Sequence, residues 1–149
     1  MPRPDDLPEP EFTRPLSIAE LREAGGASLS SEAGAAARDA LAARFGVDSV
    51  HALSLEAVVV PWGACGWRVD GRARARLVQT CVVTLEPVET AIDEPFRRFL
   101  VPAAGWREAE ETLPEADRED LERLGEVVDP GEIAAEAVAL AIDPYPRKA

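Results

Sequence analysis

The stretch WRVDGRARARLVQTCVVTLEPV, residues 67–88, decides the fold. From Trp67 onward, apolar or small residues occupy every second position, and arginines fill most of the positions between them. A period of two is typical of a β-strand with one buried and one exposed face. The alternation predicts a long strand whose inner face carries Val69, Ala73, Ala75 and Leu77 and, if it continues, Gln79, Cys81, Val83 and Leu85.

The opposite face of this strand is rich in arginine. Its four arginines, which we call the arginine row, are Arg68, Arg72, Arg74 and Arg76. Like charges side by side on one sheet face are destabilising, so we expect an anion to cover them. That anion is either Glu56, Asp70, other acids of neighbouring strands or a folded-back acidic loop, or it is an RNA phosphate backbone, which arginine binds bidentately.

Two further strands complete an antiparallel meander over residues 50–101. The first has Leu53, Leu55, Ala57 and Val59 on one face. The last, over residues 88–101, contains Pro95, which requires an edge position or a bulge. A short N-terminal strand over residues 11–17 is expected to join this sheet. Alternation alone leaves open whether the sheet closes partly into a barrel.

Two main helices are expected to cover the apolar face of the sheet. The first, over residues 31–45, is alanine-rich, with Ser31 as its N-cap and Gly46 as its stop. The second, over residues 131–142, follows Asp129 as N-cap and has an apolar face that includes Leu140. These elements predict an α+β fold, with two helices packed on a twisted antiparallel sheet.

Length and charge suggest one domain over residues 12–149, preceded by a flexible arm over residues 1–11 that is rich in proline and acid. The net charge of −12 opposes non-specific contact with phosphate, so any RNA contact must be local. Residues 107–129 hold ten acids against three arginines, a net charge of −7. We expect this segment to be mainly an acidic loop, with one helical turn around residues 117–124.

Signatures of catalysis are missing from the sequence. It has no Gly-rich phosphate loop, no nucleophile elbow and no His-Glu-x-x-His pair. Two cysteines and the single His51 are too few for a structural zinc site. Cys81 is therefore interpreted as a buried packing residue. We expect a monomeric, cytoplasmic, non-enzymatic protein without cofactor, metal or membrane span.

Four segments in order resemble the YceD family of large ribosomal RNA subunit accumulation proteins: EFTRPL, TCVVTLEPV, IDEPFRRFLV and GEVVDPGEIAAEAVALAIDPYPR. The resemblance spans residues 12–147. The residues that match the family pattern include Cys81, Thr84, Glu86, Pro87, Asp129, Gly131, Pro144, Tyr145 and Pro146. In many members of the family that this chain resembles, the pattern Cys-x-x-Cys stands where this chain has Cys81 and Thr84. That departure argues against a metal or redox role for the pair here.

The resemblance implies a bacterial cytoplasmic factor needed for synthesis, processing or stability of the large-subunit (23S) ribosomal RNA, with no known enzymatic reaction. Its partner would be that RNA or its precursor, contacted directly or through a ribosomal protein. The alternative is an acidic adaptor that holds a basic large-subunit ribosomal protein during assembly, because an acidic chain suits such a partner better than it suits RNA.

Overall fold

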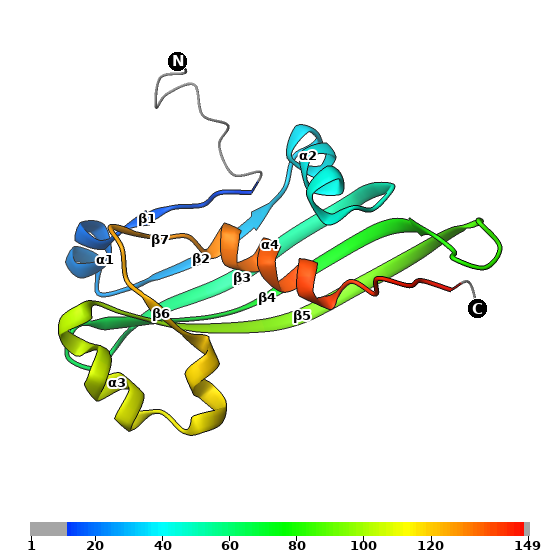
Figure 1. The fold of residues 1–149 in the computed structure, drawn as a ribbon. Coiled ribbons are helices and arrows are strands. Elements are labelled where there is room, and N and C mark those ends of the chain that lie inside the picture. The colour runs from blue at the N-terminus through cyan, green and yellow to red at the C-terminus, as the bar shows by residue number, and fades with distance from the viewer. Residues whose placement is uncertain (1–11, 148–149) are drawn as a thin grey trace, which may run out of the picture.

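An open five-stranded sheet forms the centre of the protein in the computed structural model, which describes residues 12–147 (Figure 1). Its strand order is β2-β3-β4-β5-β6, antiparallel except that β6 runs parallel to β5. The outer strands β2 and β6 do not pair with each other, so the sheet is not a closed barrel. The strands are β2 (Ala27–Glu32), β3 (Ser49–Trp62), β4 (Gly66–Thr80), β5 (Pro87–Val101) and β6 (Leu121–Arg123).

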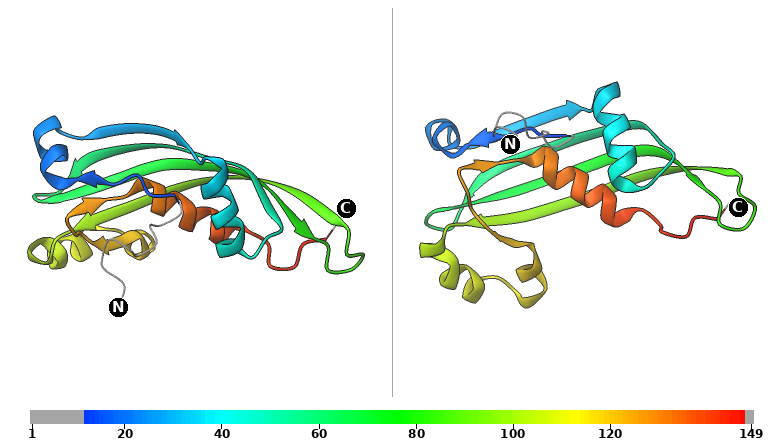
Figure 2. Two further views of the ribbon diagram at one scale, coloured as in Figure 1. Left: turned by 90° about the horizontal axis from the view of Figure 1, so that it is seen from above. Right: turned by 45° about the horizontal axis from the view of Figure 1, so that its top comes forward.

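The two predicted main helices are present and lie on the same side of the sheet (Figure 2). They are α2 (Ala35–Phe45) and α4 (Pro130–Ala141). Leu41 of α2 and Val138 of α4 are fully buried in one apolar core with the inward residues of β3 and β4. The predicted α+β class is therefore confirmed.

The N-terminal strand does not join the main sheet as predicted. Strand β1 (Leu16–Ser17) pairs instead with β7 (Val127–Val128) in a separate two-stranded sheet. The short helix α1 (Ile18–Ala24) follows, with the Ser17 hydroxyl accepting from the Glu20 amide, and ends at Gly25 in the left-handed region. The predicted arm over residues 1–11 lies outside the described residues.

The first predicted helix begins later than expected, because its predicted start lies in the edge strand β2. Ser31 lies in β2, in register with Leu55, and α2 begins only at Ala35 with Gly34 as its N-cap. The side chains of β2 are mostly alanine and serine, so its alternation lacks the contrast that makes a strand visible in sequence. The predicted stop at Gly46 is confirmed, because its amide bonds the Ala42 and Ala43 carbonyls.

Strand β4 ends earlier than the alternation suggested. Its last residue is Thr80, and the chain then turns into β5. Cys81 is buried as predicted, but Val83 and Leu85 are 68% and 76% exposed rather than in the core. The reason is that residues 82–84 form a turn, so the two-residue period of the strand no longer applies there, and Leu85 follows in the left-handed region with a φ of 61°.

The acidic segment is structured rather than mainly loop. It contains α3 (Trp106–Thr112), the 3₁₀ turn η3 (Glu115–Asp120), β6 and β7, and the 3₁₀ turn η2 (Ala103–Gly105) precedes it. Ala109, Leu113 and Leu121 pack with Phe99 and Val101 in a second apolar cluster. Phe99 is in register with Arg68, so this cluster covers one end of the arginine face.

Helix α4 begins as predicted, with the Asp129 carboxylate accepting from the Glu132 amide. Its inner face is buried, with Ile133, Ala134 and Val138 at most 6% exposed. Leu140, however, is 82% exposed, so its assignment to the inner face was wrong. Within residues 12–147, none of the helices has the length and apolar character required to span a membrane.

Candidate functional site

The arginine row occupies the outward positions of β4. Arg68, Arg72, Arg74 and Arg76 are exposed, whereas Ala73, Ala75 and Leu77 between and beside them are at most 3% exposed. The alternation that predicted this face is thus observed. The role of the row in RNA contact stays a prediction.

Acids of the same sheet face pair with three of the four arginines. Arg68 Nε lies 2.6 Å from Asp70 Oδ2, and Arg72 Nη1 lies 2.7 Å from Asp93 Oδ1. Arg74 lies 3.7 Å from Glu56 and 3.6 Å from Asp93. The register explains the pairs of Arg72 and Arg74, because Glu56 faces Arg72 and Asp93 faces Arg74 across the strands. Asp70 lies two positions after Arg68 in the same strand.

The Arg72–Asp93 pair has consequences for protonation. The hydrogen bond that Arg72 donates, followed by its charge, lowers the pKa of Asp93 below its ordinary value. The same hydrogen bond and charge raise the pKa of Arg72. Both groups therefore stay charged at neutral pH, and each neutralises the other.

Arg76 differs from the other three. It is exposed and forms no ion pair with any of residues 12–147. Its cross-strand neighbours are Ala52 and Ala91, which carry no charge. A shallow hollow of about 350 Å³ lies beside it, lined mainly by small side chains and by Arg74 and Asp93. Arg76 is thus the member of the row best placed to meet an external anion.

The acids of the 107–129 segment bind other arginines. Arg97 Nη2 lies 2.6 Å from Asp117 Oδ1, and Arg98 Nε lies 3.2 Å from Glu122 Oε1. Among residues 12–147, the acids of this segment form no ion pair with the row, although its apolar cluster covers one end of the same face. The acids of the sheet itself are what cover most of the row.

The first group of family-pattern residues forms the β4–β5 hairpin. The Cys81 amide donates to the Glu86 carbonyl at 2.8 Å, and the Thr84 amide donates to the Cys81 sulfur at 3.4 Å. The Glu86 amide donates to the Thr84 hydroxyl at 3.3 Å, and Pro87 begins β5. Cys81 is 1% exposed, in agreement with a packing role.

The C-terminal family residues lie against this hairpin. The Val82 amide donates to the Pro146 carbonyl at 3.0 Å, and Gln79 Nε2 donates to the Asp143 carbonyl at 2.8 Å. Pro144 and Tyr145 lie between these contacts, and the ring of Tyr145 points outward, with 71% of the residue exposed. The structure thus joins two sequence segments that are about sixty positions apart.

Asp129 and Gly131 anchor the other end of α4. Asp129 accepts from the Thr13 hydroxyl at 2.6 Å and from the Arg14 amide at 2.7 Å. A Cβ on Gly131 would lie 2.3 Å from the Phe12 carbonyl oxygen, so only glycine permits this approach. These residues hold the N-terminal segment onto the helix. Within residues 12–147, no group of three or more histidines, cysteines or acids is placed to hold a metal.

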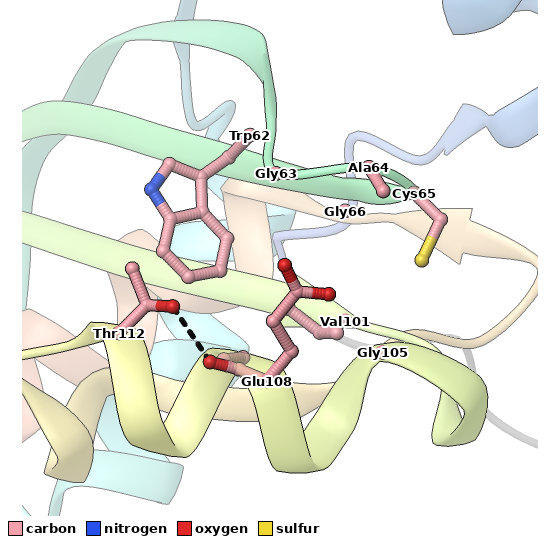
Figure 3. A pocket seen from close by; sticks show the side chains of 10 residues that line it. Trp62, Gly63, Ala64, Cys65, Gly66, Val101, Gly105, Glu108 and Thr112 are labelled. Atoms are coloured by element: carbon pink, nitrogen blue, oxygen red, sulfur yellow. Dashed lines mark hydrogen bonds between the residues drawn. The ribbon is translucent and has the colours of Figure 1, made fainter.

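A pocket at the end of the arginine face was not predicted. It has a volume of about 170 Å³ and lies between the β3–β4 turn and α3 (Figure 3). Trp62, Cys65 and Glu108 provide its principal side chains, and we call it the Trp62–Glu108 pocket. Trp62 and Glu108 are far apart in sequence, so no spacing pattern could have linked them.

Comparison with known proteins bears on the identity of the chain. The family model described as "Large ribosomal RNA subunit accumulation protein YceD" matches residues 69–149, more than half of the chain. The chain belongs to the YceD family. The YceD match includes Arg72, Arg74 and Arg76 and begins one residue after Arg68. No curated protein and no solved structure matches the chain.

Proposed function

We propose that this YceD-family chain is a non-enzymatic bacterial factor that supports synthesis, processing or stability of the large-subunit (23S) ribosomal RNA. We infer further that it acts in the cytoplasm by holding a basic large-subunit ribosomal protein during assembly. The family description supports the link to large-subunit RNA. The distribution of paired and unpaired charges supports the protein-holding mode.

The unpaired acids of the 107–129 segment are the observation that carries this proposal. Its exposed glutamates without an ion pair to any of residues 12–147 are Glu108, Glu110, Glu115, Glu119 and Glu126. By contrast, three arginines of the row are already matched by acids of the sheet. Unpaired surface charges attract a partner of opposite sign, whereas matched charges do so weakly. The free charge is therefore acidic and suits a basic partner.

A triple substitution tests the protein-holding mode. The variant Glu110→Gln, Glu115→Gln, Glu119→Gln removes three unpaired charges of the segment. We expect it to bind basic large-subunit ribosomal proteins roughly tenfold more weakly at physiological salt, since each exposed pair contributes about 0.2–1 kcal/mol. Pull-down from lysate, followed by affinity measurement with the captured protein, gives the comparison.

The matched control is Glu20→Gln, Glu23→Gln, Glu89→Gln, which removes the same charge from exposed positions outside the segment. It should bind as the wild type does. If both variants lose the same amount of binding affinity, the interaction depends on net charge alone, and a specific acidic site is refuted. Unchanged capture by the first variant would refute the protein-holding mode.

Direct RNA contact by the arginine row is the second candidate. Arg76 favours it, because its guanidinium is exposed and has no acid within ion-pair distance among residues 12–147. Phosphate at Arg72 or Arg74 would compete with Asp93, since both arginines pair with that carboxylate. That competition lowers the gain from each phosphate contact and makes the row the weaker candidate.

A further inference from the structure

We propose that the Trp62–Glu108 pocket binds one arginine side chain of a basic protein. This inference rests on the proposed function, because the pocket would be one of the contacts that bind the basic partner. The pocket lies on α3, the helix that carries part of the unpaired acid.

The size of the pocket suits a single long side chain. Its volume is about 170 Å³. Pockets for cofactors and drug-sized ligands span about 300–1,000 Å³, so this one is too small for such a molecule. Its floor and walls come mostly from small or apolar residues: Gly63, Ala64, Gly66, Val101, Gly105 and Ala109. An apolar stem with a charged head fits this lining.

The two functional groups of the pocket match a guanidinium. Figure 3 shows the Glu108 carboxylate pointing from α3 toward the β3–β4 turn, with the Trp62 ring beside it. A carboxylate pairs bidentately with arginine, and an indole face stacks on the planar guanidinium. The Trp62 ring is held in place by Phe99, with ring centroids 4.8 Å apart.

The local charge selects a cation over a phosphate. Glu108 forms no ion pair with the described part of the chain, so its charge is available. The single basic residue of α3, Arg107, is 3.4 Å from Glu111, which does not line the pocket. An RNA phosphate would be repelled here, whereas an arginine would be attracted.

Two glycines let the pocket walls approach closely. A Cβ on Gly105 would lie 2.9 Å from the Cys65 sulfur, and one on Gly66 would lie 2.9 Å from the Trp62 carbonyl oxygen. The turn and η2 are therefore in contact before any ligand arrives. A pre-formed site avoids part of the ordering cost of binding.

Cys65 provides a direct reporter of occupancy. Its thiol is exposed and lines the pocket, whereas Cys81 is buried and serves as an internal reference. The alkylation rate of Cys65 by iodoacetamide is measured by mass spectrometry, with and without an acetylated, amidated peptide of four Arg-Gly repeats. We expect the peptide to slow alkylation of the wild-type chain at least threefold.

Two variants separate specific binding from general attraction. Glu108→Gln should lose the protection, whereas Glu89→Gln, which makes the same charge change outside both the pocket and the 107–129 segment, should keep it. Both positions are exposed, so neither change should affect folding. Equal protection in both variants, or none in the wild type, would overturn the proposal.

Capture of basic ribosomal proteins by the wild-type chain is measured alongside. If the chain captures basic ribosomal proteins but the peptide does not protect Cys65, the proposal for the pocket is overturned and the proposed function stands. Protection that requires Glu108, without capture, supports the pocket and overturns the protein-holding function. The two failures are therefore distinguishable.

Discussion

At the scale of single residues, the four arginines of the row are chemically unequal. Asp70 and Asp93 neutralise Arg68 and Arg72 at close hydrogen-bond distance, whereas Arg76 has no acidic partner within residues 12–147. The sequence predicted which side chains share the face, because period-two alternation depends only on position along the strand. It could not predict the Asp93 pairing, which depends on the register between β4 and β5.

The Arg72–Asp93 pair leads to a prediction about protonation. Arg72 lowers the pKa of Asp93, first through its hydrogen bond. The pair therefore stabilises the fold above the pKa of an unfolded aspartate, and this contribution is lost as pH falls through the lowered pKa of Asp93. We expect Arg72→Ala to raise the pKa of Asp93 toward its ordinary value, as measured by NMR titration of the carboxyl carbon.

Arg76→Ala is the control for this titration, since Arg76 has no ion pair with Asp93. It should leave the pKa of Asp93 unchanged. An unchanged pKa of Asp93 in Arg72→Ala would show that Arg72 does not pair with this carboxylate in solution. Arg72 would then be available to bind an RNA phosphate.

At the scale of elements, α4 links the N-terminal segment to the β4–β5 hairpin. Its N-cap Asp129 accepts from the Thr13 hydroxyl and the Arg14 amide, and Gly131 allows the close approach of the Phe12 carbonyl. The tail after its C-terminus bonds the hairpin. Family-pattern residues lie at both junctions, which assigns them a packing role. The helix itself was predictable from its cap and apolar face, but these junctions join residues more than sixty positions apart and leave no local signal.

Substitution of Gly131 tests the N-terminal junction. In Gly131→Ala, the new Cβ would lie 2.3 Å from the Phe12 carbonyl oxygen, so backbone must move. We expect a loss of about 1–3 kcal/mol in the free energy of unfolding, despite the better helix propensity of alanine. Urea denaturation measures this change.

Gly125→Ala is the matched control, because nothing lies within 4 Å of its added Cβ. Its effect should stay within about 0.5 kcal/mol. If the two variants are equally stable, the close contact between α4 and the N-terminal segment does not exist in solution.

At the scale of the whole molecule, charge is arranged in two regions. The sheet face carries arginines matched largely by acids of the same face, and the 107–129 segment carries unpaired glutamates at one end of that face. The composition of the segment showed its excess of acidic residues, but it did not predict the helix, turn and strands that the segment forms. The apolar residues that fold the segment, such as Ala109, Leu113 and Leu121, are too sparse to show a period, and they are buried in a cluster with Phe99 and Val101 of β5.

Site-specific photo-crosslinking in cells distinguishes the protein-holding mode from direct RNA contact. A benzoylphenylalanine replaces Ala116 in η3 or, separately, Ala91 on the arginine face; both positions are exposed and uncharged. RNA and protein attached to each variant are then identified. We predict that position 116 attaches to a basic large-subunit ribosomal protein and that position 91 does not attach to RNA. Attachment of large-subunit ribosomal RNA at position 91, with no ribosomal protein at position 116, would contradict this prediction.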